Sequence, residues 1–332
     1  MNNEQKIIWR NIVQNFVFSL NATLPIFFVM MLGYFFRKTG VISESLATGM
    51  NSFVFKIALP VNLFAELYPV DFFTVWDTSF VLFCFFATLA CVGIAVLLSL
   101  FFCPAEDRGE FVQASYRSSA SLLGMAYIEN IYGNAGTGAS AAMGSLMMLG
   151  AVPLYNVCAV LVLSLSGGSQ GRLDRARLKK ALIGIVTNPI ILGILAGFVW
   201  SVLKIPMPEM FGKTFSYIGR LASPMGLLAM GASLNFTAFS EKMRPVLFAT
   251  FLKLVGFAAL GLPAAAALGF RQEKLVAVLI MLGSASTVAG YVMAKNMGHK
   301  GIVSSGTVML TTLLSSLTLT FWLFLLRSRG LI

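Results

Sequence analysis

The segment Lys56-Ile-Ala-Leu-Pro60 has a close counterpart 164 positions later, Arg220-Leu-Ala-Ser-Pro224. Several matches at nearly one offset, in one order, indicate that the chain is a duplicated unit of about 164 residues. Further matched positions are Pro25 with Pro189, Gly33 with Gly197, and Ser119-Ala120-Ser121 with Ser284-Ala285-Ser286, the last at an offset of 165.

The composition is that of a membrane protein. Of the 332 residues, 58% are hydrophobic and 11% are charged, whereas a soluble domain has about 25% charged residues. The apolar runs are continuous, which excludes the alternating strands of a membrane β-barrel. Since about 20 apolar residues cross the hydrocarbon core as a helix, the sequence predicts an all-α polytopic membrane protein.

Each half of the chain contains five apolar runs, so we predict ten transmembrane helices. An odd number in each half makes the second half enter from the opposite side, which gives a 5+5 inverted repeat, as in many secondary transporters. The expected divisions are an N-terminal segment at 1–14 (an interfacial helix or a frayed end), a first repeat at 15–165, a basic cytoplasmic loop at 166–180, a second repeat at 181–326, and a tail at 327–332. The runs lie near 15–36, 46–67, 78–102, 111–132, 138–165, 181–202, 211–234, 245–268, 273–297 and 303–326.

The formal charge is +11. Because the basic residues lie mostly in short loops, orientation in a bilayer explains this charge better than nucleic-acid binding does. The loop 166–180 contains five basic residues against Asp174 alone, so we place it in the cytoplasm and both termini outside. The four cysteines lie in apolar runs without a CxxC pair, and His299 is the single histidine. We therefore expect no metal and no cofactor.

Two small, polar segments, Ser118–Gly124 and Gly283–Gly290, interrupt the fourth and ninth runs. Broken helices there would line a cavity and present N–H groups to an anion, although such clusters also let helices pack closely. The candidate substrate-binding residues in them are Ser118, Ser119, Ser121, Gly124, Ser284, Ser286 and Thr287.

Charged residues within spans are few, and they usually face a polar interior. Lys56 and Arg220 are equivalent in the repeat, and we predict that they line or flank an anion path; the alternative is that they snorkel to the interface. Arg117 begins the polar part of the fourth run and is expected to meet the substrate from the cytoplasmic side. For Lys253 we expect only a pairing with Glu129 or a main-chain carbonyl.

Four prolines are expected to break helices or to act in gating. Pro60 and Pro224 should kink or break the second and seventh helices, because proline removes the hydrogen bond to the residue four positions earlier. Pro25 and Pro189, which are paired by the repeat, are grouped with them.

An ordered set of segments resembles the auxin efflux carrier family of bacterial permeases. This resemblance implies ten helices, a crossing of broken fourth and ninth helices near the membrane centre, and small organic anions such as malate, malonate or an indole acid. The family usually has Asn and then Gly-x-Pro in the fourth helix, where this chain has Ser119 and Ala126; Ala285 stands where the ninth helix often has Pro. The resembling segments are Leu24-Pro25-Ile26 with Gly33-Tyr34, Asn51 through Pro60, Asn188-Pro189-Ile190, Ala222–Leu227 and Gly231–Leu234.

The predicted function is a permease that moves small organic anions, such as mono- or dicarboxylates, across a bacterial inner membrane by alternating access. The alternatives are a sodium-coupled symporter of the bile-acid-carrier type and a receptor or scaffold that does not transport. An enzyme is disfavoured, because no nucleophile with a base, carboxylate pair or metal set lies within the spans. The coupling ion, H⁺ or Na⁺, stays open; the expected partners are the anion, the bilayer and a second copy in a homodimer, but not nucleic acid.

Overall fold

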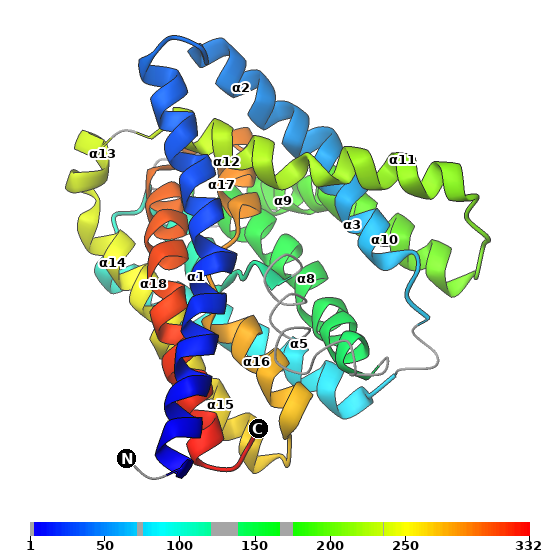
Figure 1. Cartoon of the computed structure of the whole chain (residues 1–332). Coiled ribbons are helices and arrows are strands. Elements are labelled where there is room, and N and C mark those ends of the chain that lie inside the picture. Colours follow the sequence, from blue (N-terminus) through cyan, green and yellow to red (C-terminus); the bar gives the residue numbers. More distant parts are fainter. Residues whose placement is uncertain (1–2, 72–75, 121–138, 167–174, 235) are drawn as a thin grey trace.

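The structure is a computed structural model that describes residues 3–71, 76–120, 139–166, 175–234 and 236–332. All regular elements in these ranges are helices, and none is a strand. Figure 1 shows that α1 (Asn3–Lys38) and α18 (Ile302–Ser328) lie side by side. The N-terminal end of α1 and the C-terminal end of α18 lie at the same end of the bundle. Residues 3–14 are continuous with the first predicted span.

Within the described ranges, five helical segments are long and apolar enough to cross a membrane. Two of them are composite: Met243–Ala267 contains α14 (Met243–Phe251), the π-helical η3 (Leu252–Gly256) and α15 (Phe257–Ala267), and Gln272–Asn296 contains α16 (Gln272–Gly283) and α17 (Val288–Asn296). The others are α5 (Thr78–Phe102), Leu146–Ser166 within α8 (Ala139–Ser166), and α18. This is the make-up of a multi-pass membrane protein.

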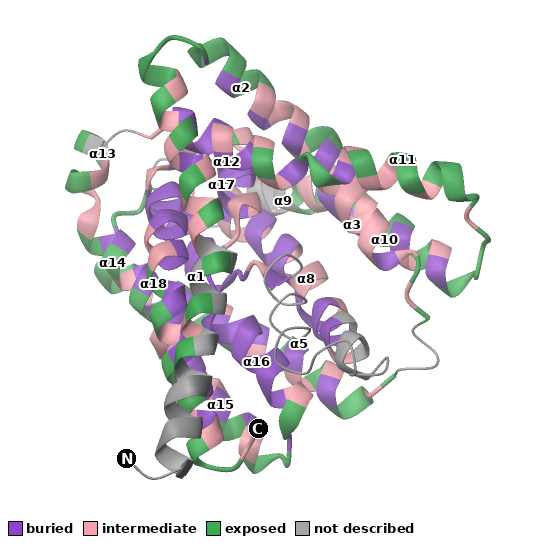
Figure 2. Cartoon of the chain, viewed as in Figure 1, coloured by how far each residue is buried: buried purple, intermediate pink, exposed green. Residues whose placement is uncertain are grey.

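Helix α5 lies at the edge of the bundle and α16 at its centre. The buried residues of α5 recur every three or four positions, from Phe80 to Ser99, and its other faces expose large apolar side chains such as Phe86 and Phe101. Exposed apolar faces of this kind suit contact with lipid. Every residue of α16 from Leu275 to Gly283 is buried, and the ribbon of this helix is largely purple in Figure 2.

Two glycines bring pairs of helices into backbone contact. A Cβ on Gly33 of α1 would lie 2.3 Å from the carbonyl oxygen of Leu228 in α12 (Ala222–Ala232), and one on Gly197 of α10 (Pro189–Val202) would lie 3.0 Å from that of Phe64 in α3 (Leu59–Leu67). Gly33 and Gly197 are 164 residues apart, and so are Phe64 and Leu228. The contact of α1 with α12 therefore recurs as the contact of α10 with α3, with the two halves exchanged.

The second helix is not broken at Pro60. It runs without a gap through α2 (Glu44–Phe53), π-helical η1 (Val54–Ala58) and α3. The N–H of Leu59 bonds to the carbonyl of Val54, five residues earlier, and this widened turn directly precedes Pro60, which has no N–H to donate. Pro25 likewise lies inside the unbroken α1.

In the seventh span the α-helix is interrupted for one residue, Leu221, which itself has helical dihedral angles (φ −69°, ψ −21°). Helix α11 (Glu209–Arg220) and α12 meet at Leu221, three residues before Pro224.

The sixth predicted span, 181–202, consists of two helices. Helix α9 (Arg175–Val186) begins within the stretch expected to be a basic loop, whose residues 167–174 lie outside the described ranges. It ends before Asn188, which is extended (φ −69°, ψ 120°) and whose Oδ1 accepts from the N–H of Ile190 at 3.0 Å. Pro189 then starts α10, because a residue before proline avoids the helical region and proline suits the first helical position.

The short helix α13 (Phe236–Glu241) leads into α14, and α6 (Arg108–Tyr116) follows α5. Helix α6 is buried from Gly109 to Tyr116, so it enters the bundle centre directly from its N-terminal end.

Candidate functional site: a cavity beside two broken helices

Helix α6 and helix α16 both end inside the bundle. After Tyr116 the chain is extended at Arg117 (φ −72°, ψ 131°). After Gly283 it is extended at Ser284 (φ −83°, ψ 171°) and again at Thr287 (φ −88°, ψ 139°), where α17 begins. The second interruption falls within the stretch 283–290, and the first begins one residue before the stretch 118–124; both stretches were expected to break a helix.

A backbone hydrogen bond joins the two interruptions. The N–H of Ser119 donates to the carbonyl oxygen of Ala285 at 3.0 Å, so segments more than 160 residues apart touch through their backbones. These are the positions at which the family pattern has Asn and Pro. The contact between the fourth and ninth runs therefore forms in this chain without proline.

Serine and threonine side chains satisfy backbone groups that the breaks leave open. The Ser286 Oγ donates to the carbonyl of Ala114 in the last turn of α6 at 3.0 Å, while the Ser286 N–H donates to Thr311 Oγ1 of α18 at 3.0 Å. Thr287 Oγ1 caps α17 by accepting from the N–H of Ala289 at 3.3 Å. The hydroxyls expected to contact a carboxylate thus hold the broken ends in place.

A cavity of about 390 Å³ lies against both interruptions, a volume within the usual range for small-molecule sites. Its wall comes from both halves of the chain. Four pairs of lining residues are related by the repeat offset: Ile26 with Ile190, Leu59 with Ser223, Leu63 with Leu227, and Ala120 with Ala285.

Arg117 is the cation in the described wall of this cavity. It is 3% exposed; its Nη2 donates to Asn156 Oδ1 at 3.0 Å, its Nη1 lies 3.6 Å from the sulfur of Met293, and its Nε has no acceptor. No described carboxylate pairs with it. A buried charge without a counter-ion is costly, so the site favours an anion next to the guanidinium.

The N-terminal end of α17 adds a second source of positive potential. Thr287, Val288 and Ala289 line the same cavity as Arg117. The first N–H groups of a helix lack partners within it, and the helix dipole places partial positive charge there. The cavity therefore has two features that attract an anion, one on each broken region.

Most of the remaining wall is aliphatic. Ile26 and Val29 of α1, Val152 of α8 and Val292 of α17 contribute to it. Such a wall suits the apolar part of a ligand, because the charged side chain in the described wall, Arg117, lies at one place in it.

The structure brings together only part of the predicted set. Ser121 and Gly124 lie outside the described residues. Ser284 is buried away from the described wall, and Lys56 and Arg220 are exposed and do not line it. Pro60 and Pro189 do not line it either. The predicted residues in the wall are Arg117, Ser118, Ser119, Ser286, Thr287, Pro25 and Pro224.

Some wall residues were not predicted from the sequence. Asn156 holds the Arg117 guanidinium, and Tyr155, Asn62 and Thr312 also line the cavity. Asn156 could have been noticed, since it is the single asparagine in the run 138–165 and polar residues inside spans usually face the bundle interior.

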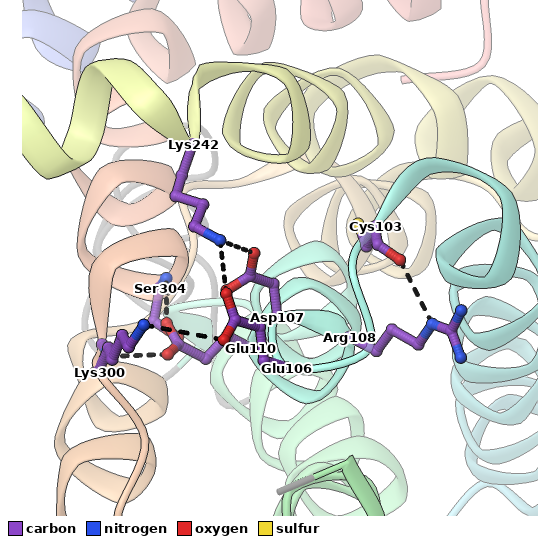
Figure 3. A network of polar contacts seen from close by, with 9 residues as sticks. Cys103, Glu106, Asp107, Arg108, Glu110, Lys242, Lys300 and Ser304 are labelled. Carbon is purple, nitrogen blue, oxygen red and sulfur yellow. Dashed lines mark hydrogen bonds and ion pairs between the residues drawn. The ribbon is translucent and has the colours of Figure 1, made fainter. Parts of the chain in front are cut away.

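A cluster of charges fixes the start of α6 (Figure 3). Glu110 is 2% exposed, and its carboxylate accepts from the N–H groups of Gly301 at 2.7 Å and Ser304 at 3.0 Å, which caps the start of α18. Lys242 pairs with Glu106 at 2.8 Å and Asp107 at 2.7 Å. These carboxylates raise the pKa of Lys242, and Lys242 lowers the pKa of Glu106.

The pattern of the membrane transport protein family matches residues 18–323. The chain belongs to this family. The predicted membership of the auxin efflux carrier family is thereby confirmed, and the chain is a multi-pass membrane transporter by family.

Relatives carry the names of transporters rather than of enzymes. The chain is 27% identical over 329 residues to a protein of Rhizobium meliloti (strain 1021) named "Putative malonate transporter", covering 93% of this chain and 96% of that one. It is 25% identical over 252 residues to "Uncharacterized transporter YfdV" of Escherichia coli (strain K12), covering 72% and 75%. An "Uncharacterized transporter" of Methanothermobacter thermautotrophicus is 21% identical over 311 residues, covering 92% and 98%.

Among solved structures, the fold is similar to that of the sodium proton antiporter MjNhaP1 from Methanocaldococcus jannaschii. The TM-score is 0.58 at 12% identity, and the match covers 94% of this chain and 99% of that one. At this identity the likeness concerns the fold alone.

Proposed function

We propose that the protein is a secondary transporter of small organic anions that carry one carboxylate on an apolar body, moved across a bacterial inner membrane by alternating access. The observation that carries this proposal is the buried Arg117 guanidinium, which faces the cavity between the two halves without a described counter-ion. An anion that bound there would neutralise a charge that folding leaves uncompensated.

The paired contacts support a 5+5 inverted repeat with ten spans, divided as 15–165 and 181–326. Gly33 against Leu228 and Gly197 against Phe64 are the same contact with the halves exchanged. The four repeat-related pairs in the cavity wall lie where such halves would meet. Alternating access requires two units that can rock about a central site, and inverted repeats supply them. Both termini would then lie outside the cytoplasm.

The wall favours a monocarboxylate over a dicarboxylate. One described cation and one helix N-terminus can each interact with the same carboxylate, while the aliphatic residues favour an apolar remainder. Malonate or another dicarboxylate is the second candidate, because the relative in Rhizobium meliloti carries the name of that substrate.

The test is uptake into liposomes that contain the purified protein. Wild-type protein should take up aliphatic and aromatic monocarboxylates, and Arg117→Met should reduce the uptake at least about tenfold, the loss expected for one charge-assisted contact. Arg329→Met, which removes an exposed arginine after α18, is the matched control and should transport normally.

Three outcomes would redirect the proposal. Full uptake by Arg117→Met would reject an anion site at the guanidinium. Binding of carboxylates without flux would support the receptor or scaffold. Flux that requires a sodium gradient would support the symporter of the bile-acid-carrier type.

A further inference from the structure

Lys253 is buried near the middle of a membrane span. It belongs to η3 and is 0% exposed. Its Nζ donates to Ser118 Oγ at 2.5 Å, to the carbonyl of Leu282 at 3.0 Å and to that of Met281 at 3.2 Å. A lysine ammonium has three N–H donors, so all three are used, and every acceptor is a neutral oxygen.

The acceptors come from the two broken regions. Met281 and Leu282 are in the last turn of α16, where carbonyls have no partner further along the helix and carry the negative end of its dipole. Ser118 follows the end of α6, and its hydroxyl also donates to the carbonyl of Met281. The ammonium therefore joins the C-terminal end of one half-helix to the other interruption.

The surroundings keep these oxygens in place. Tyr155 donates its hydroxyl to the carbonyl of Met281 at 3.3 Å, and the Trp322 indole donates to the carbonyl of Leu254, beside Lys253, at 3.0 Å. No described carboxylate forms an ion pair with Lys253. Unwound carbonyls and half-helix C-terminal ends are the groups that hold a coupling cation in transporters with broken helices.

We propose that Lys253 is a resident cation: its ammonium occupies an oxygen site formed by Ser118, Met281 and Leu282, in which a coupling Na⁺ would otherwise bind. The carrier then needs no sodium at this place. Removal of the side chain leaves the oxygens, and so creates a site for a monovalent cation from solution. For the coupling of transport this rests on the proposed function, whereas the cation site itself does not.

The experiment measures thermal unfolding of the purified full chain in detergent, in equal concentrations of sodium, ammonium, methylammonium or choline chloride. The wild-type midpoint should be the same in all four salts. Lys253→Ala should unfold at a lower temperature in choline and regain about 3 °C or more in at least one of the small cations, in a saturable manner. Choline is the reference because it has no N–H donor.

Two further variants separate cation binding from a general salt effect. Lys253→Met fills the space with an uncharged chain and should be destabilised without a response to any cation. Lys56→Ala removes the exposed lysine of the π-helical segment η1 and should behave as wild type.

Sodium-specific stabilisation of the wild type would overturn the proposal, and this measurement stands even where Lys253→Ala does not fold. A folded Lys253→Ala that ignores all three small cations would also overturn it. Because no substrate is present, these results are independent of whether the chain transports organic anions.

Discussion

The π-helical segments η1 and η3 each contain a lysine, and the two lysines have opposite surroundings. Lys56 in η1 is exposed, whereas Lys253 in η3 is 0% exposed and gives all its hydrogen bonds to neutral oxygens. The difference arises from what lies opposite: η3 faces the end of a helix that stops inside the bundle. The lysine of a π-helical turn thus binds backbone oxygens only where another helix ends nearby and leaves its carbonyl groups without hydrogen-bond donors.

The cations of the central region are also those without a repeat partner. At an offset of 165 from Arg117 the chain has Leu282, and at the same offset before Lys253 it has Thr88. Lys56 and Arg220 do match each other, and both are exposed. Under the proposed repeat, the matched residues belong to the scaffold, and the charged residues in the centre are places where the two halves differ.

The largest expected effect is on stability at Lys253. Lys253→Ala should lower the free energy of unfolding in choline by about 2–4 kcal/mol, since it leaves three buried oxygens without their donor and opens a cavity. Lys56→Ala should change it by less than about 0.5 kcal/mol, as for most exposed residues. Denaturant unfolding of both variants in one detergent compares them; equal losses would remove the distinction between the two segments.

The next effect concerns Arg117, and it has opposite signs for binding and stability. Arg117→Met should weaken carboxylate binding about tenfold to a hundredfold, because a charge-assisted contact is lost. The variant should be as stable as wild type or more so, because an unpaired buried charge is replaced by an apolar chain. Titration calorimetry and thermal unfolding measure the two; a strongly destabilised variant would mean that Arg117 is structural.

A smaller loss is expected at Asn156, which acts on the ligand through the guanidinium it holds. Asn156→Leu should weaken carboxylate binding about threefold to tenfold, because the orientation of Arg117 is lost while its charge stays. In the Arg117→Met background the same change should have almost no effect on binding. Independent losses in the two backgrounds, measured by a double-mutant cycle, would contradict this order of action.

The exposed pair should matter less. The double variant Lys56→Ala with Arg220→Ala should slow anion uptake by no more than about threefold, since exposed charges act through a screened field. Uptake rates at low and high salt test this. Complete loss of uptake would restore the prediction that the pair lines the anion path itself.

The smallest effect is the pH dependence due to the charge cluster at the start of α6. Because Lys242 lowers the pKa of Glu106, the stabilisation is present at neutral pH and is lost as pH falls below the ordinary value of 4.5. Since the carboxylates raise the pKa of Lys242, the stabilisation from these ion pairs is also lost when the pH rises above the ordinary lysine value of 10.5. Glu106→Gln should flatten the acid side of a plot of unfolding temperature against pH, and an unchanged slope would contradict this.

The interruptions could be predicted from local composition. Ser, Gly and Thr in the stretches 118–124 and 283–290 indicate weak helices, and the described parts are non-helical at 117–119 and 284–287. The repeat offset also relates Gly33 to Gly197, and these two glycines form matching helix contacts. The helix interruptions and the glycine contacts could be predicted because each is determined by the residues of one or two helices.

The partners across the bundle could not be predicted. Lys253 was expected to meet Glu129 or a main-chain carbonyl; it meets carbonyls, and Glu129 lies outside the described residues. Which carbonyl groups lack a hydrogen-bond donor within their own helix depends on where α16, distant in sequence, ends. Likewise, the hydroxyl of Ser286 donates to the carbonyl of Ala114 in α6, a contact that only the crossing geometry determines.

The most direct test of an anion pocket at the seam of the molecule is the discrimination between a carboxylate and its uncharged amide. Calorimetric titration of wild type and Arg117→Met with matched acid and amide pairs measures it. Wild type should bind the acid at least about tenfold more tightly than the amide, and the variant should bind the two alike. A variant that retains the full preference for the acid would contradict the account.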